Sequence, residues 1–206
     1  MQQASGAGIT PAEPMAPQAV PTSLGQPAIS PAAPAPEAVA DASTARKAFF
    51  ETMQALPALQ TQNGTRDVYV MFDPQCPHCR DLYKQHEAVA QKHDIQFHWI
   101  PMFLNDRSWA MSAFLLKTAQ SSPQKGQALL DAMLSKTWNP QDDAEAVLQL
   151  TEDDYAYAKQ AALAFYEASK DSPVLGTPLV SFQMPNGEIE LISGVPRPDD
   201  WLVLAE

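Results

Sequence analysis

The feature that most constrains the fold is a short apolar run that leads directly into a pair of cysteines. The run is Val68-Tyr69-Val70-Met71-Phe72, and Asp73-Pro74 ends it. Five consecutive apolar residues of this type are typical of a strand that is buried on both faces, as in the centre of a parallel sheet. Cys76 and Cys79 follow at once, where helical spacing begins. We therefore expect a buried strand, a tight turn and a helix whose first turn carries both cysteines.

This helix is predicted to begin at Cys76-Pro77 and to end near His93-Asp94. One face of it is predicted to hold Cys79, Leu82, Tyr83, His86, Val89 and Ala90. Over residues 95–99 apolar and polar side chains alternate, which indicates a second strand that Pro101 closes. A strand, a helix and a strand in this order place the two strands parallel, with a right-handed crossover.

The next part of the chain, from about residue 105 to residue 173, has the patterns of helices. Three helix starts are expected there, at Ser108 as a cap, at Ser122-Pro123 and at the capping box Thr151-x-x-Asp154. The Ser108 helix is predicted over residues 109–119, and the Ser122 helix is predicted to end near Lys136.

A hairpin and a short helix are predicted at the C-terminal end. Met184-Pro185-Asn186-Gly187 separates two apolar runs, at residues 179–183 and 188–192, and Pro-Asn-Gly is a strong hairpin signal. Pro198 then opens a short last helix that contains Trp201. The element order is β-α-β, a helical insertion, then β-β-α, which predicts an α/β chain with a thioredoxin fold.

The first 40 residues differ in composition from the rest. They hold 8 of the 19 prolines and 11 alanines, with no aromatic residue, Lys or Arg. Proline disfavours helix and sheet, and few side chains here could be buried, so we expect a disordered tail that acts as a spacer. A Pro-rich ligand for another domain is the alternative. A helix capped by Asp41 or Ser43 should follow, so the predicted folded domain covers residues 41–206.

Composition excludes several classes of protein. The net charge is −11, so binding to a nucleic-acid backbone is not expected. No apolar run approaches the ~18 residues that span a membrane. The start, Met1-Gln2-Gln3-Ala4, lacks the basic and apolar regions of a secretory signal. The chain is therefore either cytosolic, or a form from which a signal or anchor is absent.

Cys76-Pro77-His78-Cys79 points to redox chemistry. The reactive form of cysteine is the thiolate, and free N–H groups at a helix start favour that anion at Cys76. Pro77 loses nothing there because its N–H would be unpaired, and His78 can add a donor or a positive charge. Cys79 lies one turn away on the apolar face, so it should be shielded and act as the resolving thiol. No cofactor beyond this pair is expected.

Metal binding is the alternative interpretation of the two cysteines. One Cys-x-x-Cys supplies two ligands only, and the other histidines lack the spacing of a zinc site. We expect His86 to be a hydrogen-bonded core residue, His93 to lie exposed at a helix end, and His98 to lie on the sheet surface. Neither a metal site nor a disulfide scaffold is therefore predicted.

Gly176-Thr177-Pro178 precedes the hairpin. In a thioredoxin fold this loop faces the helix start that carries the cysteines. A cis Thr177-Pro178 bond would turn the backbone of Thr177 outward, where an extended substrate peptide could pair with it. The three residues are therefore candidate substrate-binding residues.

These pieces together resemble the thioredoxin-fold Dsb proteins, specifically the catalytic domain of the DsbC/DsbG type. The matching pieces are the segment 68–79, the helical insertion, and the Gly176-Thr177-Pro178 loop with its hairpin up to Ser193-Gly194. The resemblance implies a periplasmic or extracytoplasmic thiol–disulfide oxidoreductase of the reductase or isomerase kind. It implies that Cys76 is the nucleophile, that Cys79 resolves, that protein cysteines are the substrates, and that a DsbD-like membrane reductase supplies electrons.

The resemblance has departures, and other functions stay open beside it. Pro-His between the cysteines is the dipeptide of the oxidase DsbA, and Val70 stands where thioredoxin and DsbA carry a buried acid. No dimerisation domain precedes the predicted domain, so a monomer is expected. The alternatives are a DsbA-like oxidase, a binding or assembly module with incidental thiol chemistry, and a metallochaperone.

Overall fold

The computed structural model describes residues 36–139, 141–170 and 176–204, with side chains described from residue 42 onward. Residues 1–35 of the predicted tail, and the end of the predicted insertion at 171–173, lie outside the described residues. The first helix, α1, is Pro36–Ala55. The predicted start at Asp41 or Ser43 is therefore wrong. The helix begins at Pro36, and proline is frequent at a first helical position because its missing N–H would have no partner there.

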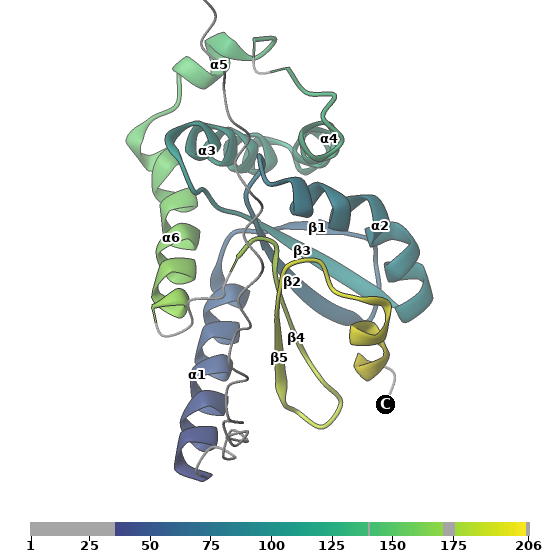
Figure 1. Cartoon of the computed structure of the whole chain (residues 1–206). Coiled ribbons are helices and arrows are strands. Elements are labelled where there is room, and N and C mark those ends of the chain that lie inside the picture. Colours follow the sequence, from purple (N-terminus) through teal and green to yellow (C-terminus); the bar gives the residue numbers. More distant parts are fainter. Residues whose placement is uncertain (1–35, 140, 171–175, 205–206) are drawn as a thin grey trace, which may run out of the picture. The chain divides into compact units, whose positions relative to one another are not determined.

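The remaining predicted elements follow in the predicted order, with two additional short ones, a strand at 59–61 and a helix at 144–148 (Figure 1). The other helices are α2 (Pro77–His93), α3 (Asp106–Ser121), α4 (Pro123–Leu134), α5 (Ala144–Leu148), α6 (Glu152–Ser169) and the 3₁₀ helix η1 (Pro198–Leu204). The strands are β1 (Leu59–Thr61), β2 (Arg66–Phe72), β3 (Ile95–Pro101), β4 (Leu179–Gln183) and β5 (Ile189–Ser193). None of these helices, within the described part of the chain, is long and apolar enough to cross a membrane.

The five strands form one sheet in the order β1-β3-β2-β4-β5. Strands β2 and β3 run parallel, with Val70 opposite Trp99, and α2 crosses between them. Strand β4 pairs antiparallel with β2, where Met71 lies opposite Leu179, and the hairpin adds β5. The α/β class and the predicted β-α-β and β-β units are confirmed. The register also places the start of β4 beside the end of β2, which is where the cysteines follow.

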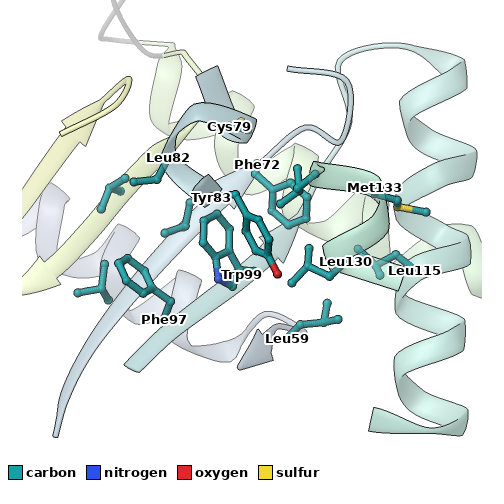
Figure 2. Packing of buried hydrophobic residues seen from close by; sticks show 14 of the residues in the cluster. Leu59, Phe72, Cys79, Leu82, Tyr83, Phe97, Trp99, Leu115, Leu130 and Met133 are labelled. Carbon is teal, nitrogen blue, oxygen red and sulfur yellow. The ribbon is translucent and has the colours of Figure 1, made fainter. Parts of the chain in front are cut away.

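Strand β2 is buried on both faces, as the apolar run predicted, because helices cover each face. Val68, Val70 and Phe72 point into a core with α2, α3, α4 and η1, while Tyr69 and Met71 point into a second core with α1 and α6. Figure 2 shows the first core, in which Cys79 and Leu82 from α2 pack near residues of the sheet. The helix that carries the cysteines is therefore fixed against the sheet.

Some local details differ from the sequence predictions. The N-cap of α3 is Asn105, and Ser108 is the third helical residue of a reciprocal capping box with it, so the predicted Ser108 cap is wrong. The Ser122 cap and the capping box of Thr151 with Asp154 are confirmed. Strand β1 and helix α5 were not predicted, because segments of three and five residues are too short to show a period.

The structure tests the three histidine expectations. His86 is buried, and its Nδ1 bonds the Tyr83 carbonyl, as expected. His93 is buried and not exposed, since it ends α2 beside Arg66, whose guanidinium donates to the His93 carbonyl at 2.7 Å. His98 does lie on the second face of the sheet, but that face is covered, so the predicted surface position is wrong. Its ring stacks on Tyr69 at 4.4 Å.

Candidate active site

Cys76 is the N-cap residue of α2, and the helix begins at Pro77 behind it. Its backbone is extended, with φ −67° and ψ 123°, and the Cys76 N–H donates to the Asp73 carbonyl at 3.0 Å. The side chain is partly exposed. A sulfur at this position meets the free N–H groups of the first helical turn, which favour an anion.

The pKa of Cys76 is lowered to about 5. The largest cause is a hydrogen bond from the Cys79 side chain, which stabilises the thiolate and outweighs the opposing effect of burial. The Thr177 side chain and the backbone groups of Cys79 and His78 lower the pKa further. Most of the thiol is therefore ionised at neutral pH.

Cys79 has the opposite character. It is fully buried at the first turn of α2, and both cysteines are free thiols. Burial, together with the neighbouring Cys76, raises the pKa of Cys79 well above the usual range of a thiol. The pair thus consists of an accessible, ionised sulfur and a shielded, protonated one.

The Gly176-Thr177-Pro178 loop lies against this pair. The Thr177-Pro178 bond is cis, and the Cys76 Sγ lies 3.2 Å from the Thr177 carbonyl oxygen. Two hydrogen bonds from backbone N–H groups hold the loop in place. The Gly176 N–H donates to the Ser193 hydroxyl at 2.7 Å, and the Gly194 N–H donates to the Pro178 carbonyl at 2.8 Å. The structure therefore brings the two predicted site segments together, about 100 residues apart in the chain.

His78 occupies a different environment from the cysteines. Its side chain is exposed, while its backbone contributes to lowering the Cys76 pKa. The role that the sequence suggested for the imidazole stays a prediction.

The sequence analysis missed Asp73, which it treated only as the end of a strand. This carboxylate is buried, and its two oxygens accept from the backbone N–H groups of Gln75, at 2.7 Å, and Leu104, at 2.9 Å. It thereby joins the turn that leads to Cys76 to the loop after β3. The available signal was a charged residue directly after a fully buried strand.

The described residues show no cluster of side chains suited to bind a metal ion. No group of three or more His, Cys, Asp or Glu side chains is placed there to hold an ion. The chemistry that this arrangement supports is that of two sulfurs of unequal pKa beside a buried Thr177, whose backbone the sequence analysis predicted to turn outward.

Comparison with known proteins adds evidence on the fold. No family model matches the chain, and no curated protein matches it either. Solved structures do match. One is a periplasmic thioredoxin-like protein from Salmonella enterica serovar Typhimurium, with a TM-score of 0.59 at 20% identity, covering 77% of this chain and 97% of that one.

Two further structures match over similar lengths. The thiol-disulfide exchange protein alpha-DsbA2 from Wolbachia pipientis has a TM-score of 0.58 at 13% identity, covering 84% of this chain and 96% of that one. The catalytic domain of ScsC from Proteus mirabilis has a TM-score of 0.56 at 14% identity, covering 79% and 96%. This chain therefore has the thioredoxin-like fold that these proteins share.

Proposed function

We propose that the chain is a thiol–disulfide oxidoreductase that acts on the cysteines of other proteins. The observation that carries this proposal is the unequal pair: Cys76 is ionised and partly exposed beside Thr177, and Cys79 is protonated and buried behind it. A thiolate is the attacking form in thiol–disulfide exchange, and a low thiol pKa also makes a good leaving group.

The reaction proceeds in two exchanges. The Cys76 thiolate attacks one sulfur of a substrate disulfide, forms a mixed disulfide and releases the other substrate sulfur as a thiolate, which takes up a proton. Cys79 then loses its proton and attacks the Cys76 sulfur. This step forms the Cys76–Cys79 disulfide and releases the second substrate sulfur, so the substrate gains two electrons and the enzyme loses two.

We favour the reductase or isomerase direction, of the DsbC/DsbG type. In isomerisation the thiolate of a different substrate cysteine attacks the substrate sulfur bonded to Cys76. This forms a new substrate disulfide and releases the Cys76 thiolate, without net oxidation. Threonine before the cis-proline supports this assignment through the resemblance. The direction also requires an electron donor, for which we propose a DsbD-like membrane reductase.

A DsbA-like oxidase is the second candidate, and the low pKa of Cys76 favours it. Stabilising the thiolate stabilises the reduced pair, so the Cys76–Cys79 disulfide becomes a stronger oxidant. In that direction the disulfide is donated to a reduced substrate by the same steps in reverse.

We further propose a periplasmic or other extracytoplasmic location and a monomeric state. Disulfides of protein substrates persist mainly in oxidising compartments, and one neighbour in structure is described as periplasmic. The reaction needs no cofactor beyond the two cysteines.

The experiment is a trapping assay with matched variants. The Cys79→Ala variant should accumulate mixed disulfides with substrate proteins, and the Cys76→Ala variant should accumulate none. Reactivation of a scrambled multi-disulfide protein by the reduced enzyme would support the isomerase, whereas oxidation of a reduced protein by the disulfide form would support the oxidase. Equal trapping by both variants, or none by either, would contradict the proposed function.

A further inference from the structure

A notch with aromatic walls lies between the first turns of α3 and α6. Six residues line it: Asp106, Trp109, Glu152, Tyr155, Ala156 and Lys159. The four from α6 recur at helical spacing, so they form one continuous strip along that helix. Figure 1 shows α3 and α6 as neighbours beside the sheet.

The walls of the notch are the rings of Trp109 and Tyr155. These rings meet edge to face, with centroids 5.0 Å apart, and Phe103 stacks on Trp109 at 4.9 Å. The indole N–H donates to the Tyr155 carbonyl at 3.2 Å, so the polar atom of the indole is satisfied within the protein. Trp109 nevertheless stays partly exposed. The notch therefore offers π surface to a ligand.

The rim of the notch carries carboxylates that the fold leaves available. Asp106 and Glu152 are exposed, and neither belongs to an ion pair found among the described residues. Nearby Asp154, by contrast, is bound to Lys117 at 2.7 Å. With Lys159 as the single base, the lining has a net negative charge, as has the whole chain.

The loop after β3 connects this notch to the redox pair. Asn105, next to Asp106, donates from its side chain to Gln75 at 3.4 Å, and Gln75 directly precedes Cys76. Leu104, with 61% of its surface exposed, is fixed to the same turn through Asp73. A polypeptide held at Cys76 can therefore extend over an apolar residue toward the notch.

We propose that the notch binds an arginine side chain of the substrate protein, a few residues from the cysteine that reacts with Cys76. A guanidinium stacks on aromatic rings and pairs with carboxylates in a planar geometry, which matches the walls and rim described above. This inference rests on the proposed function, since it names a class of substrate for the same redox site.

The test uses synthetic peptides whose single cysteine is linked to thionitrobenzoate. The Cys79→Ala variant of the full chain attacks the peptide sulfur through Cys76, forms a stable mixed disulfide and releases the coloured thiolate, so the second-order rate is read directly. Arginine is placed from two to seven residues on either side of the cysteine. Citrulline, which is neutral and of the same shape, and norleucine, which is apolar, replace it in matched peptides.

At one spacing the arginine peptide should react roughly tenfold faster than the citrulline peptide at low salt, from combined cation–π and surface ion-pair contributions. The double substitution Asp106→Asn, Glu152→Gln should bring the ratio of the arginine rate to the citrulline rate close to one. Lys159→Gln should raise this ratio. The double substitution Asp199→Asn, Glu51→Gln changes the net charge equally at exposed sites elsewhere and should preserve the ratio.

The outcomes separate this inference from the proposed function. If no peptide reacts and small disulfides do not react either, the proposed function fails. If peptides react but arginine, citrulline and norleucine give equal rates at every spacing, only the notch is overturned. The proposed arginine site is also overturned if the norleucine peptide reacts fastest, or if both double variants lose the arginine-to-citrulline rate ratio to the same extent.

Discussion

The Sγ of Cys76 lies 3.2 Å from the carbonyl oxygen of Thr177, and the two atoms interact favourably only while the sulfur keeps its proton. The thiol can donate to the carbonyl, whereas the thiolate has no proton to donate. The Thr177 side chain acts in the opposite direction, because its hydrogen bond lowers the pKa of Cys76. One residue thus both opposes and supports ionisation, and the Cys79 hydrogen bond, the largest cause, decides in favour of the thiolate.

Removing the Thr177 hydroxyl should therefore raise the pKa of Cys76. We expect Thr177→Val to move it upward from about 5, toward the ~8.5 of a free thiol, because the carbonyl remains and the stabilising donor is lost. The measurement is the pH dependence of Cys76 alkylation in the Cys79→Ala background. Thr177→Ser keeps a hydroxyl and is the matched control. A midpoint that is the same in the Val and Ser variants would refute the assignment.

The reduced protein should become more stable as the pH rises from about 5 to about 8. The folded pKa of Cys76, about 5, lies below the ~8.5 of an unfolded thiol. This stabilisation is complete above the unfolded value and is lost as the pH falls through the folded value. Because the sulfur is partly exposed, we expect a gain of about 2 kcal/mol, under half of the full linkage value.

Urea unfolding of the reduced chain at pH 5 and pH 8 checks this. The Cys76→Ser variant is the reference, because it lacks the stabilisation that ionisation of Cys76 provides. The comparison stays below pH 8.5, where the raised pKa of Cys79 begins to act with the opposite sign. A difference between wild type and Cys76→Ser that is the same at both pH values would contradict the prediction.

The sequence predicted those parts of the fold whose signals are local. Five apolar residues specify β2 as buried on both faces, and Pro185-Asn186-Gly187 specifies the hairpin, because each signal lies within the element that it describes. The burial of His98 was not predictable in this way. Its burial depends on side chains of the two adjacent strands, about 30 to 40 residues earlier in the chain: the ring of Tyr69 stacks on it, and Asp67 and Gln60 contact its two nitrogens.

In the candidate site, too, residues with a local signal were predicted and a residue whose role depends on a distant group was missed. Cys76 and Cys79 were found because a helix start favours a thiolate at any such position. Asp73 was missed because its role depends on the N–H of Leu104, 31 residues later. A charged residue directly after a fully buried strand is a signal in the sequence, but it does not tell which distant N–H group the carboxylate will bind.

Asp73 should prove necessary for the stability of the active-site turn. Asp73→Ala removes the acceptor of the Gln75 N–H and one of two acceptors of the Leu104 N–H, which keeps the Ser108 hydroxyl at 3.1 Å. We expect the free energy of unfolding to fall by about 1–3 kcal/mol. Asp73→Asn keeps one acceptor oxygen and should lie between Ala and wild type. Asp199→Ala, at an exposed carboxylate, should change stability by less than about 0.5 kcal/mol. Urea titration of all three variants measures the order, and an equal loss in the Asp73 and Asp199 alanine variants would contradict it.

Gly126 sets how closely α4 approaches α3. A Cβ at this buried position would lie 2.5 Å from the Cβ of Ala119, and 2.5 Å from its Cα, which is closer than packed atoms come. Helix propensity alone favours Gly126→Ala by about 1 kcal/mol, but overpacking costs about 1–3 kcal/mol. We therefore expect a net loss of about 1 kcal/mol. The exposed Ala128 of the same helix is the matched control, where the alanine form should be more stable than Ala128→Gly because only propensity acts. Thermal unfolding of both pairs should give opposite signs, and a stabilised Gly126→Ala variant would show that the two helices can separate without cost.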